Sequence, residues 1–247
     1  MHSSKHINKI KPPSKSKGVI TDLVYFLLRK PKQATQIKFD TDEERDDYNH
    51  RVMQRLGIDP NLYSVLNIHK IGVDAPVSHV FNELLRWNGD SSCWPNHIAK
   101  VDFMGDDLDR LQILPFGFKK YPFRFMKSFF GLQIIPLFLL HIIRIKRIPD
   151  DFDFDNARYI LYECSGGYPI GIFVLYVHSS IPSIGELAKT QLNIIVGFDF
   201  YGKEKWKSQY KGMNKIWEYI HNRVTANVLN RMKQLVEWRS DTIQKNE

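Results

Sequence analysis

Tyrosine, histidine and acidic side chains in the second half of the chain are the groups that could perform chemistry. Tyr176 and His178 are two residues apart, so on a strand they project to the same side and could together hold and polarise a carbonyl group. Glu163 or Asp199 could then move protons, as in an enzyme of the cyclase or dehydratase kind. Neighbouring strand residues point to opposite faces, so Glu163 and Tyr162 cannot enter one pocket, which weakens any compact acid–base set.

Motifs for other chemistries are incomplete or absent in the sequence. The run 151–155 resembles the start of a calcium loop, but Asn156 replaces the required glycine and Tyr162 stands at the position of the bidentate acid, so a solvated turn is expected. No HExxH motif, phosphate-binding glycine loop, nucleophile elbow or paired CxxC occurs. The dispersed histidines favour hydrogen-bonded core or rim positions over metal ligation: His69, His97, His178 and His221. We therefore predict no metal site and no cofactor.

Two groups of elements must position these side chains, and the first lies in the N-terminal half. Residues 63–73 alternate apolar and polar types and are rich in β-branched residues, which predicts a strand. Pro76 suits the first turn of a helix, and apolar residues at helical spacing then predict a short amphipathic helix over 76–87. Residues 88–90, Asn-Gly-Asp, end that helix.

The second group lies in the C-terminal half. Three apolar, aromatic-rich runs at 157–164, 169–178 and 190–201 are separated by turn residues, which predicts an antiparallel meander. From about Ser208 to Arg239, apolar residues recur every three or four positions and predict one long helix. At ~1.5 Å per residue this helix is roughly 48 Å long, enough to cross a small sheet.

Several of these patterns together resemble a known family. The stretch from Ile68 to Phe81 with its Ala-Pro pair, the Trp94-Pro95 pair, and the closing helix around 221–225 look like the START-like, helix-grip superfamily (SRPBCC). The resemblance covers about residues 62–239. It implies an α+β fold in which a curved antiparallel sheet of about seven strands wraps a long C-terminal helix, with an apolar cavity between them. Lipid-transfer domains, pollen-allergen-like carriers, hormone receptors and polyketide cyclases share this scaffold, so the fold does not decide the function.

The resemblance and the composition together predict three regions. Residues 1–18 form a disordered basic tail, 19–61 a helical N-terminal extension, and 62–240 the START-like ligand-binding domain. The extension contains an amphipathic run at 19–28 and a second helix that begins with a capping box, Thr41 with Glu44. Residues 118–136 stand as an insertion where the family pattern has a tight turn.

Positive charge is concentrated in two tracts. Residues 1–32 and 119–147 each carry a net charge of +7, and the rest of the chain carries −6. Each basic tract adjoins an apolar run, which favours an anionic lipid surface over a nucleic-acid backbone. The uncharged run 128–143 is shorter than the ~20 residues of a transmembrane helix and is interrupted by Pro136.

Two interpretations of the insertion remain open. It is either an extra hairpin or helix packed on the core, or a lid that covers the cavity and dips into a membrane surface. In the second interpretation six residues contact the membrane: Lys119, Lys120, Arg124, Lys127, Phe129 and Phe130.

A candidate ligand-binding set follows from the predicted strands and helices. Tyr162, Tyr176 and His178 share parity on their strands, and Trp217 and His221 fall on adjacent turns of the long helix. The strands are apolar on both faces, so the sequence does not say which parity points inward. The candidate set contains Trp87, Trp94, Tyr162, Tyr176, His178, Phe198, Trp217 and His221.

Three functions remain open, of which we favour the first. It is a carrier or sensor that binds a hydrophobic small molecule or lipid in an internal cavity at a membrane surface. The second is the cyclase or dehydratase-like enzyme described above. The third is a structural domain whose cavity is filled by some of the 16 Phe and 11 Tyr residues.

Cysteine usage and the N-terminus suggest the compartment. Cys93 and Cys164 are far apart in the sequence and are expected to be reduced thiols rather than a disulfide. The apolar run 19–28 carries Asp22 and lacks a small-residue cleavage site, unlike a secretory signal. We expect a cytoplasmic protein that associates with membranes. Ligand identity and oligomeric state do not follow from the sequence.

Overall fold

The computed structural model describes residues 19–28, 30–63, 65–85, 98–104, 107–115, 140–145, 152–165, 170–180, 190–198 and 211–244. Helices are found near both ends of the chain, with strands between them. The elements are α1 (Val19–Leu28), α2 (Asp42–Arg55), the 3-10 turn η1 (Pro60–Leu62), β1 (Val65–Val73), α3 (Val77–Leu85), β2 (Ile98–Met104), β3 (Asp107–Pro115), β4 (Leu140–Ile145), β5 (Ala157–Ser165), β6 (Ile170–Ser179), β7 (Thr190–Phe198) and α6 (Lys211–Gln244).

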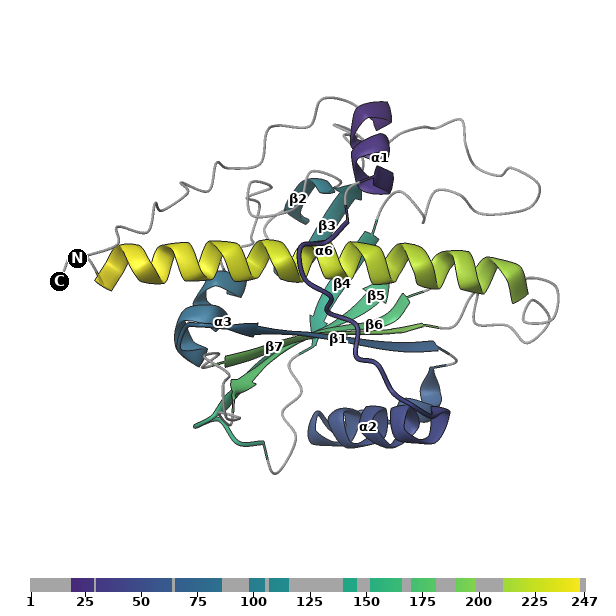
Figure 1. Ribbon diagram of the computed structural model, residues 1–247, viewed down its shortest axis with the longest axis horizontal. Coiled ribbons are helices and arrows are strands. Elements are labelled where there is room, and N and C mark those ends of the chain that lie inside the picture. The colour runs from purple at the N-terminus through teal and green to yellow at the C-terminus, as the bar shows by residue number, and fades with distance from the viewer. Residues whose placement is uncertain are drawn as a thin grey trace, which may run out of the picture.

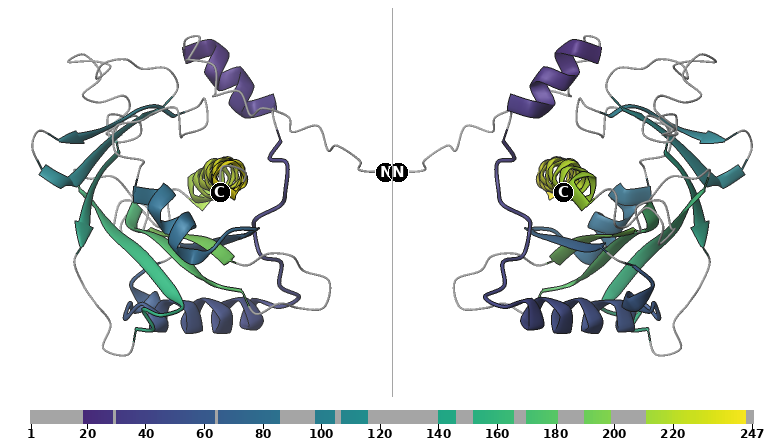
Figure 2. Two further views of the ribbon diagram at one scale, coloured as in Figure 1. Left: turned by 90° about the vertical axis from the view of Figure 1, so that its left-hand side faces the viewer. Right: turned by 90° about the vertical axis from the view of Figure 1, so that its right-hand side faces the viewer.

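The strands form one antiparallel sheet in the order β1-β7-β6-β5-β4-β3-β2. The last strand therefore pairs with the first, and β1 and β2 lie at the two edges. Viewed along α6, the sheet curves around the helix (Figure 2). Side chains are described on β1, β5, β6 and β7, whereas β2, β3 and β4 are described by their backbone pairing.

Helix α6 lies along the edge strand β1 and runs in the same direction. In the middle of β1, Asn222 of α6 forms a hydrogen bond with His69. Just beyond the end of β1, the Glu237 carboxylate accepts a hydrogen bond from the backbone N–H of Asp74 at 3.0 Å. Further contacts tie the same stretch of α6 to β1 and α3: Lys233 with the carbonyl of Gly72, His79 with Ser240, and Arg239 with the buried carboxylate of Glu83. These bonds set the position of α6 along the sheet.

On the strands whose side chains are described, β1, β5, β6 and β7, both faces are largely buried, one toward α6 and the other toward α2. The face toward α6, called the inner face, carries alternate residues that pack against α3 and α6, including Ile71, Leu175 and Leu192. The face toward α2, called the outer face, carries the intervening residues, which pack against Val52 and Met53 of α2 and against Leu56, which follows it. Burial on both faces explains why these strands are nearly continuous apolar runs.

An N-terminal strap, residues 30–37, crosses α6 on its way from α1 to α2 (Figure 1). The backbone N–H of Gln33 donates to Asn230 Oδ1 at 2.9 Å, and Asn230 Nδ2 donates back to the Gln33 carbonyl at 3.0 Å. The Thr35 hydroxyl then lies 2.9 Å from His69 Nδ1, and the backbone carbonyl of Thr35 accepts a hydrogen bond from the Lys70 N–H. The strap thus joins α6 and β1 on the side of the helix away from α3.

His69 is the polar junction of strap, sheet and helix. Its Nε2 lies 2.9 Å from Asn222 Oδ1, which can only accept, so Nε2 carries the proton. Its Nδ1 then accepts from the Thr35 hydroxyl. Burial lowers the pKa of His69, opposed by the bond to Asn222, so the ring is neutral near pH 7 with both nitrogens bonded.

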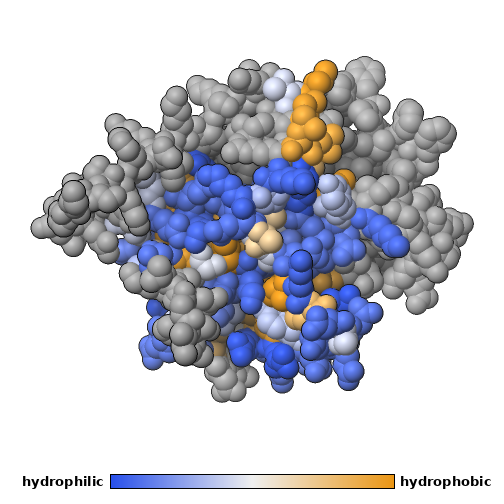
Figure 3. Space-filling view, viewed as in Figure 1, coloured by the Kyte–Doolittle hydropathy of each residue, from blue (hydrophilic) through white to orange (hydrophobic). Residues whose placement is uncertain are grey.

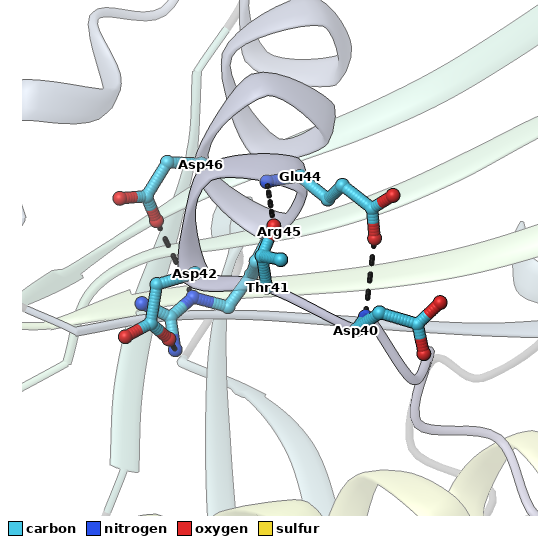
Figure 4. A network of polar contacts seen from close by, with 6 residues as sticks. All are labelled: Asp40, Thr41, Asp42, Glu44, Arg45 and Asp46. Carbon is cyan, nitrogen blue, oxygen red and sulfur yellow. Dashed lines mark hydrogen bonds and ion pairs between the residues drawn. The ribbon is translucent and has the colours of Figure 1, made fainter.

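The predicted capping box begins α2 (Figure 4). The N–H of Glu44 donates to Thr41 Oγ1 at 3.1 Å, and acidic residues occupy the positive end of the helix. The Glu44 carboxylate accepts from the N–H of Asp40 rather than Thr41, at 3.1 Å. The box is therefore confirmed, with its reciprocal bond one residue earlier than in the standard motif.

The antiparallel sheet and the long terminal helix confirm the predicted α+β helix-grip class. The expected helices at 19–28 and 76–87 are found as α1 and the slightly shorter α3. Asp153 accepts the N–H groups of Asp155 and Asn156, so the predicted solvated turn is also found. The insertion 118–136 and the basic tail lie outside the described residues, and the three-region division stays a prediction.

Replacing Thr35 by Val removes the hydroxyl and leaves His69 Nδ1 buried without its donor. We expect the free energy of unfolding to fall by about 1–2 kcal/mol, measured by urea denaturation with an unchanged m-value. The matched control is Thr21→Val on an exposed position of α1, where the expected change is below about 0.5 kcal/mol. If the two substitutions changed the free energy of unfolding equally, the stabilising role of the Thr35–His69 hydrogen bond would be contradicted.

Candidate functional site

Four inner-face residues form a transverse row across four strands. Asn67 of β1 is paired with Val196 of β7, Val196 with Phe173 of β6, and Phe173 with Tyr162 of β5. Paired residues on neighbouring strands share a face, so this register sets the four side chains side by side. The row lies one step from the row of His69, toward the beginning of β1.

Most of the transverse row is an apolar, aromatic wall. The Tyr162 ring stacks on the Phe173 ring with centroids 6.0 Å apart and an interplanar angle of 27°. Tyr162 and Val196 are buried, while Phe173 is partly buried and packs against the inner core together with Val224 of α6. The wall therefore offers aromatic and aliphatic surface close to the helix.

Asn67 is the polar member of the row. Its Nδ2 atom is buried and has no hydrogen-bond partner among the residues that the structure describes. A buried amide donor without a partner costs roughly 1–3 kcal/mol. Such a group inside an aromatic wall is suited to donate to an oxygen of a bound molecule.

His221 of α6 is a second buried polar group on the helix that covers the inner face. It immediately precedes Asn222, whose side chain reaches His69 in the neighbouring row. Burial lowers the pKa of His221 from 6.5 to about 3, so the imidazole is neutral at physiological pH. A neutral ring in an apolar environment does not attract anions and favours an uncharged partner.

The structure places the predicted residues in two groups. Tyr162 belongs to the transverse row, and His221 is buried on α6, the helix that covers the inner face. Phe198 pairs with Val65, at the next inner-face position of β7, and Trp217 precedes His221 on α6 by about one turn. The side chains of Phe198 and Trp217 lie outside the described residues, so their contribution stays a prediction.

The grouping of Tyr176 and His178 with Tyr162 was wrong. Because Tyr162 pairs with Phe173, the odd-numbered residues of β6 face inward and the even-numbered ones face α2. Tyr176 accordingly packs in the outer cluster, and its ring lies 5.1 Å from that of His178. Shared parity within separate strands carries no information about a common face until the register between them is known.

The proposed carbonyl-polarising pair therefore sits beneath α2. Burial raises the pKa of Tyr176, although Arg55 of α2 opposes this, and burial lowers the pKa of His178. Glu163 pairs with Ile172, an outer-face position, whereas Asp199 lies outside the described residues. The pair is thus separated from the transverse row by the sheet itself.

The remaining predicted residues cannot be placed. Trp87, Trp94 and the six membrane-contact residues at 119–130 lie outside the described part of the chain. Within that part, no group of three or more metal-ligating side chains is found. No helix among the described residues is long and apolar enough to cross a bilayer.

Sequence reasoning missed Asn67 and Phe173. Asn67 was visible as a polar residue that alternates with apolar neighbours on a predicted strand, but such residues normally face solvent. Its inward direction follows from β1 being covered by α6, and this became clear only from the strand order.

The buried histidine makes stability depend on pH. The folded-state pKa of His221 lies below its ordinary value of 6.5, so its contribution is full above that pH and is lost as the pH falls toward about 3. Between about pH 7 and pH 5 the wild type should lose about 2 kcal/mol from this residue. In urea titrations, the free energy of unfolding of His221→Gln should not show this fall between about pH 7 and pH 5. The control His50→Gln, at an exposed position, should show the same fall as the wild type. An unchanged pH slope in His221→Gln would contradict the assignment.

Comparison with known proteins gave matches in structure alone. No family model matches the sequence, and no curated protein matches it. The Zhui aromatase/cyclase from Streptomyces is 15% identical, over 71% of this chain and 95% of its own, with a TM-score of 0.46. The lipid transfer and protein localization domain of human StarD13 is 14% identical, over 68% and 75%, with a TM-score of 0.36. Norcoclaurine synthase from Thalictrum flavum, in complex with dopamine and hydroxybenzaldehyde, is 11% identical, over 72% and 90%, with a TM-score of 0.39.

Identities and TM-scores this low carry no argument about activity, so the fold rests on the topology of the chain itself. The last strand pairs with the first, the remaining strands follow as an antiparallel meander, and the terminal helix lies along the inner face. The chain therefore has a helix-grip topology, which is the arrangement that the resemblance of its sequence motifs implies.

Proposed function

We propose that this protein binds an uncharged, largely apolar small molecule against the transverse row of the inner face. The observation that carries the proposal is the buried Asn67 amide, which lacks a partner among the described residues and lies beside the stacked Tyr162 and Phe173. Ligand surface removed from water would contribute roughly 25 cal/mol per Å² of apolar area. The amide would donate to a carbonyl or hydroxyl oxygen and so fix the ligand's orientation.

The charges around the row support an uncharged ligand. His221 is neutral because of its burial, and the four residues of the row carry no charge near pH 7. An ionised ligand group in this environment would lose its hydration without gaining an opposite charge. The sequence resembles a superfamily that includes lipid-transfer domains and other carriers of apolar molecules, and this resemblance supports the same ligand class.

Binding without turnover is the form of the proposal that fits the geometry. The acid–base chemistry considered for a cyclase-like enzyme needed Tyr176 and His178 at the ligand, and both lie on the outer face beneath α2. A ligand held by the transverse row is separated from them by the sheet. Tyr176→Phe should therefore leave ligand occupancy unchanged.

The first experiment is to purify the protein under native conditions, denature it, and analyse the organic extract by mass spectrometry. We expect a stoichiometric, uncharged and mainly apolar compound that carries at least one oxygen acceptor. An empty extract, together with an intact native mass equal to that of the polypeptide, would favour a filled core and count against the proposal.

The amide of Asn67 can be tested by replacing it with an apolar residue of similar size. Asn67→Leu should lower ligand occupancy or affinity about tenfold, because the orienting hydrogen bond is lost. The same change should raise the free energy of unfolding of the ligand-free protein by about 1 kcal/mol, because a buried donor without a partner is removed. Calorimetry of binding and urea denaturation measure the two effects.

The matched control is Asn193→Leu, on β7 but on the outer face. The Asn193 amide donates to the Tyr176 carbonyl at 3.4 Å, so its loss should lower the free energy of unfolding slightly and leave ligand binding unchanged. Opposite signs for the two stability changes would support the distinction between a satisfied amide and one available to a ligand. Equal losses of binding in both variants would contradict it.

A further inference from the structure

We propose that α1 docks this protein on the surface of an anionic lipid bilayer. The helix carries large apolar side chains that are exposed to solvent: Ile20 is 79% exposed and Leu28 77% exposed, with Val24 and Leu27 also exposed. Figure 3 shows a column of apolar surface at the position of α1, next to hydrophilic surface. Exposed apolar side chains gathered in this way indicate an interaction site.

The exposed residues lie on one side of the helix. At about 100° per residue, Ile20, Val24, Leu27 and Leu28 fall within an arc of about 100°. Phe26 falls on the opposite side and is only 2% exposed. The helix therefore has a docked side and a free apolar side.

Helix α6 holds the docked side in place. The Arg223 guanidinium donates to the carbonyls of Phe26, at 2.6 Å, and Leu27, at 2.7 Å, and lies 5.5 Å from the centroid of the Phe26 ring. A cation at the C-terminal end of a helix satisfies free carbonyls and interacts favourably with the helix dipole. The apolar stripe is thus presented by a fixed support.

The charge around α1 matches an anionic surface. Residues 1–32 carry a net charge of +7, and Lys30 and Lys32, just beyond the helix, are exposed. An amphipathic helix with adjacent lysines buries its apolar stripe at the acyl boundary and keeps the lysines at the headgroups. A helix of 10 residues is about 15 Å long, so it would lie on the bilayer without crossing it.

Charge also argues against a second copy of the chain as the occupant. Pairing two apolar stripes would bring two segments of net charge +7 together, which is unfavourable at ordinary ionic strength. A bilayer that contains anionic lipid supplies both the apolar layer and the opposite charge. The proposal is independent of ligand binding, because none of these residues belongs to the transverse row.

Flotation of the full-length protein with phosphatidylcholine vesicles, with and without phosphatidylserine, tests the proposal. We expect binding to the vesicles that contain phosphatidylserine, weakened by added salt and reduced about tenfold or more by the double variant Ile20→Asp, Leu28→Asp. Circular dichroism should show an unchanged fold, since both side chains are exposed.

The control places the same chemical change at another exposed leucine. Leu62 is 64% exposed on η1, so Leu62→Asp and Leu28→Asp alter net charge and surface hydrophobicity alike and differ in location. Leu28→Asp should weaken flotation, and Leu62→Asp should leave it nearly unchanged. Equal losses of flotation in the two variants would overturn the proposal, and so would equal binding to vesicles with and without phosphatidylserine. It would also be overturned if the protein did not float and Leu28→Asp instead removed its self-association.

Discussion

The fixed alignment of α6 along β1 is the constraint on which the other features depend. A helix of 34 residues could slide along an apolar surface with little change in buried area, because hydrophobic contact is not directional. Hydrogen bonds from His69 Nε2 to Asn222 and from the Asp74 N–H to Glu237 remove that freedom, since a slip by one turn would leave several polar groups without partners. The helix is therefore set in position by polar contacts and stabilised by apolar ones.

Three consecutive residues of α6 connect the main features of the molecule. His221 is a buried, neutral imidazole, Asn222 bonds to His69 of β1, and Arg223 holds the end of α1. Successive residues on a helix point about 100° apart, so one turn can contact three different neighbours. The alignment that Asn222 imposes thus determines where the neutral imidazole of His221 lies, and it fixes the support for α1 as well.

Much of the fold could be predicted from the sequence, because the relevant signals are local. The 3.6-residue period of 208–239 indicated α6, the Thr41 and Glu44 pair marked the start of α2, and the apolar runs separated by glycine and serine gave β5 to β7. The direction of each strand face could not be predicted. Tyr162 and Tyr176 lie on strands that are apolar on both sides, and only their pairing through Phe173 shows that one faces α6 and the other α2. Register is a property of two strands and leaves little trace in either sequence alone.

The contrast between Asn67 and three buried polar residues that form hydrogen bonds is the strongest physical argument for a ligand. Thr190 donates to the Ala75 carbonyl, Asn230 bonds to the strap, and His69 uses both ring nitrogens. These residues bury polar atoms at little net cost, because each hydrogen bond to water is replaced by one within the protein. The Asn67 amide does not follow this rule among the described residues, although a leucine at the same position would fill similar space. A departure from local consistency beside an aromatic wall is expected where function, rather than folding, selects the residue.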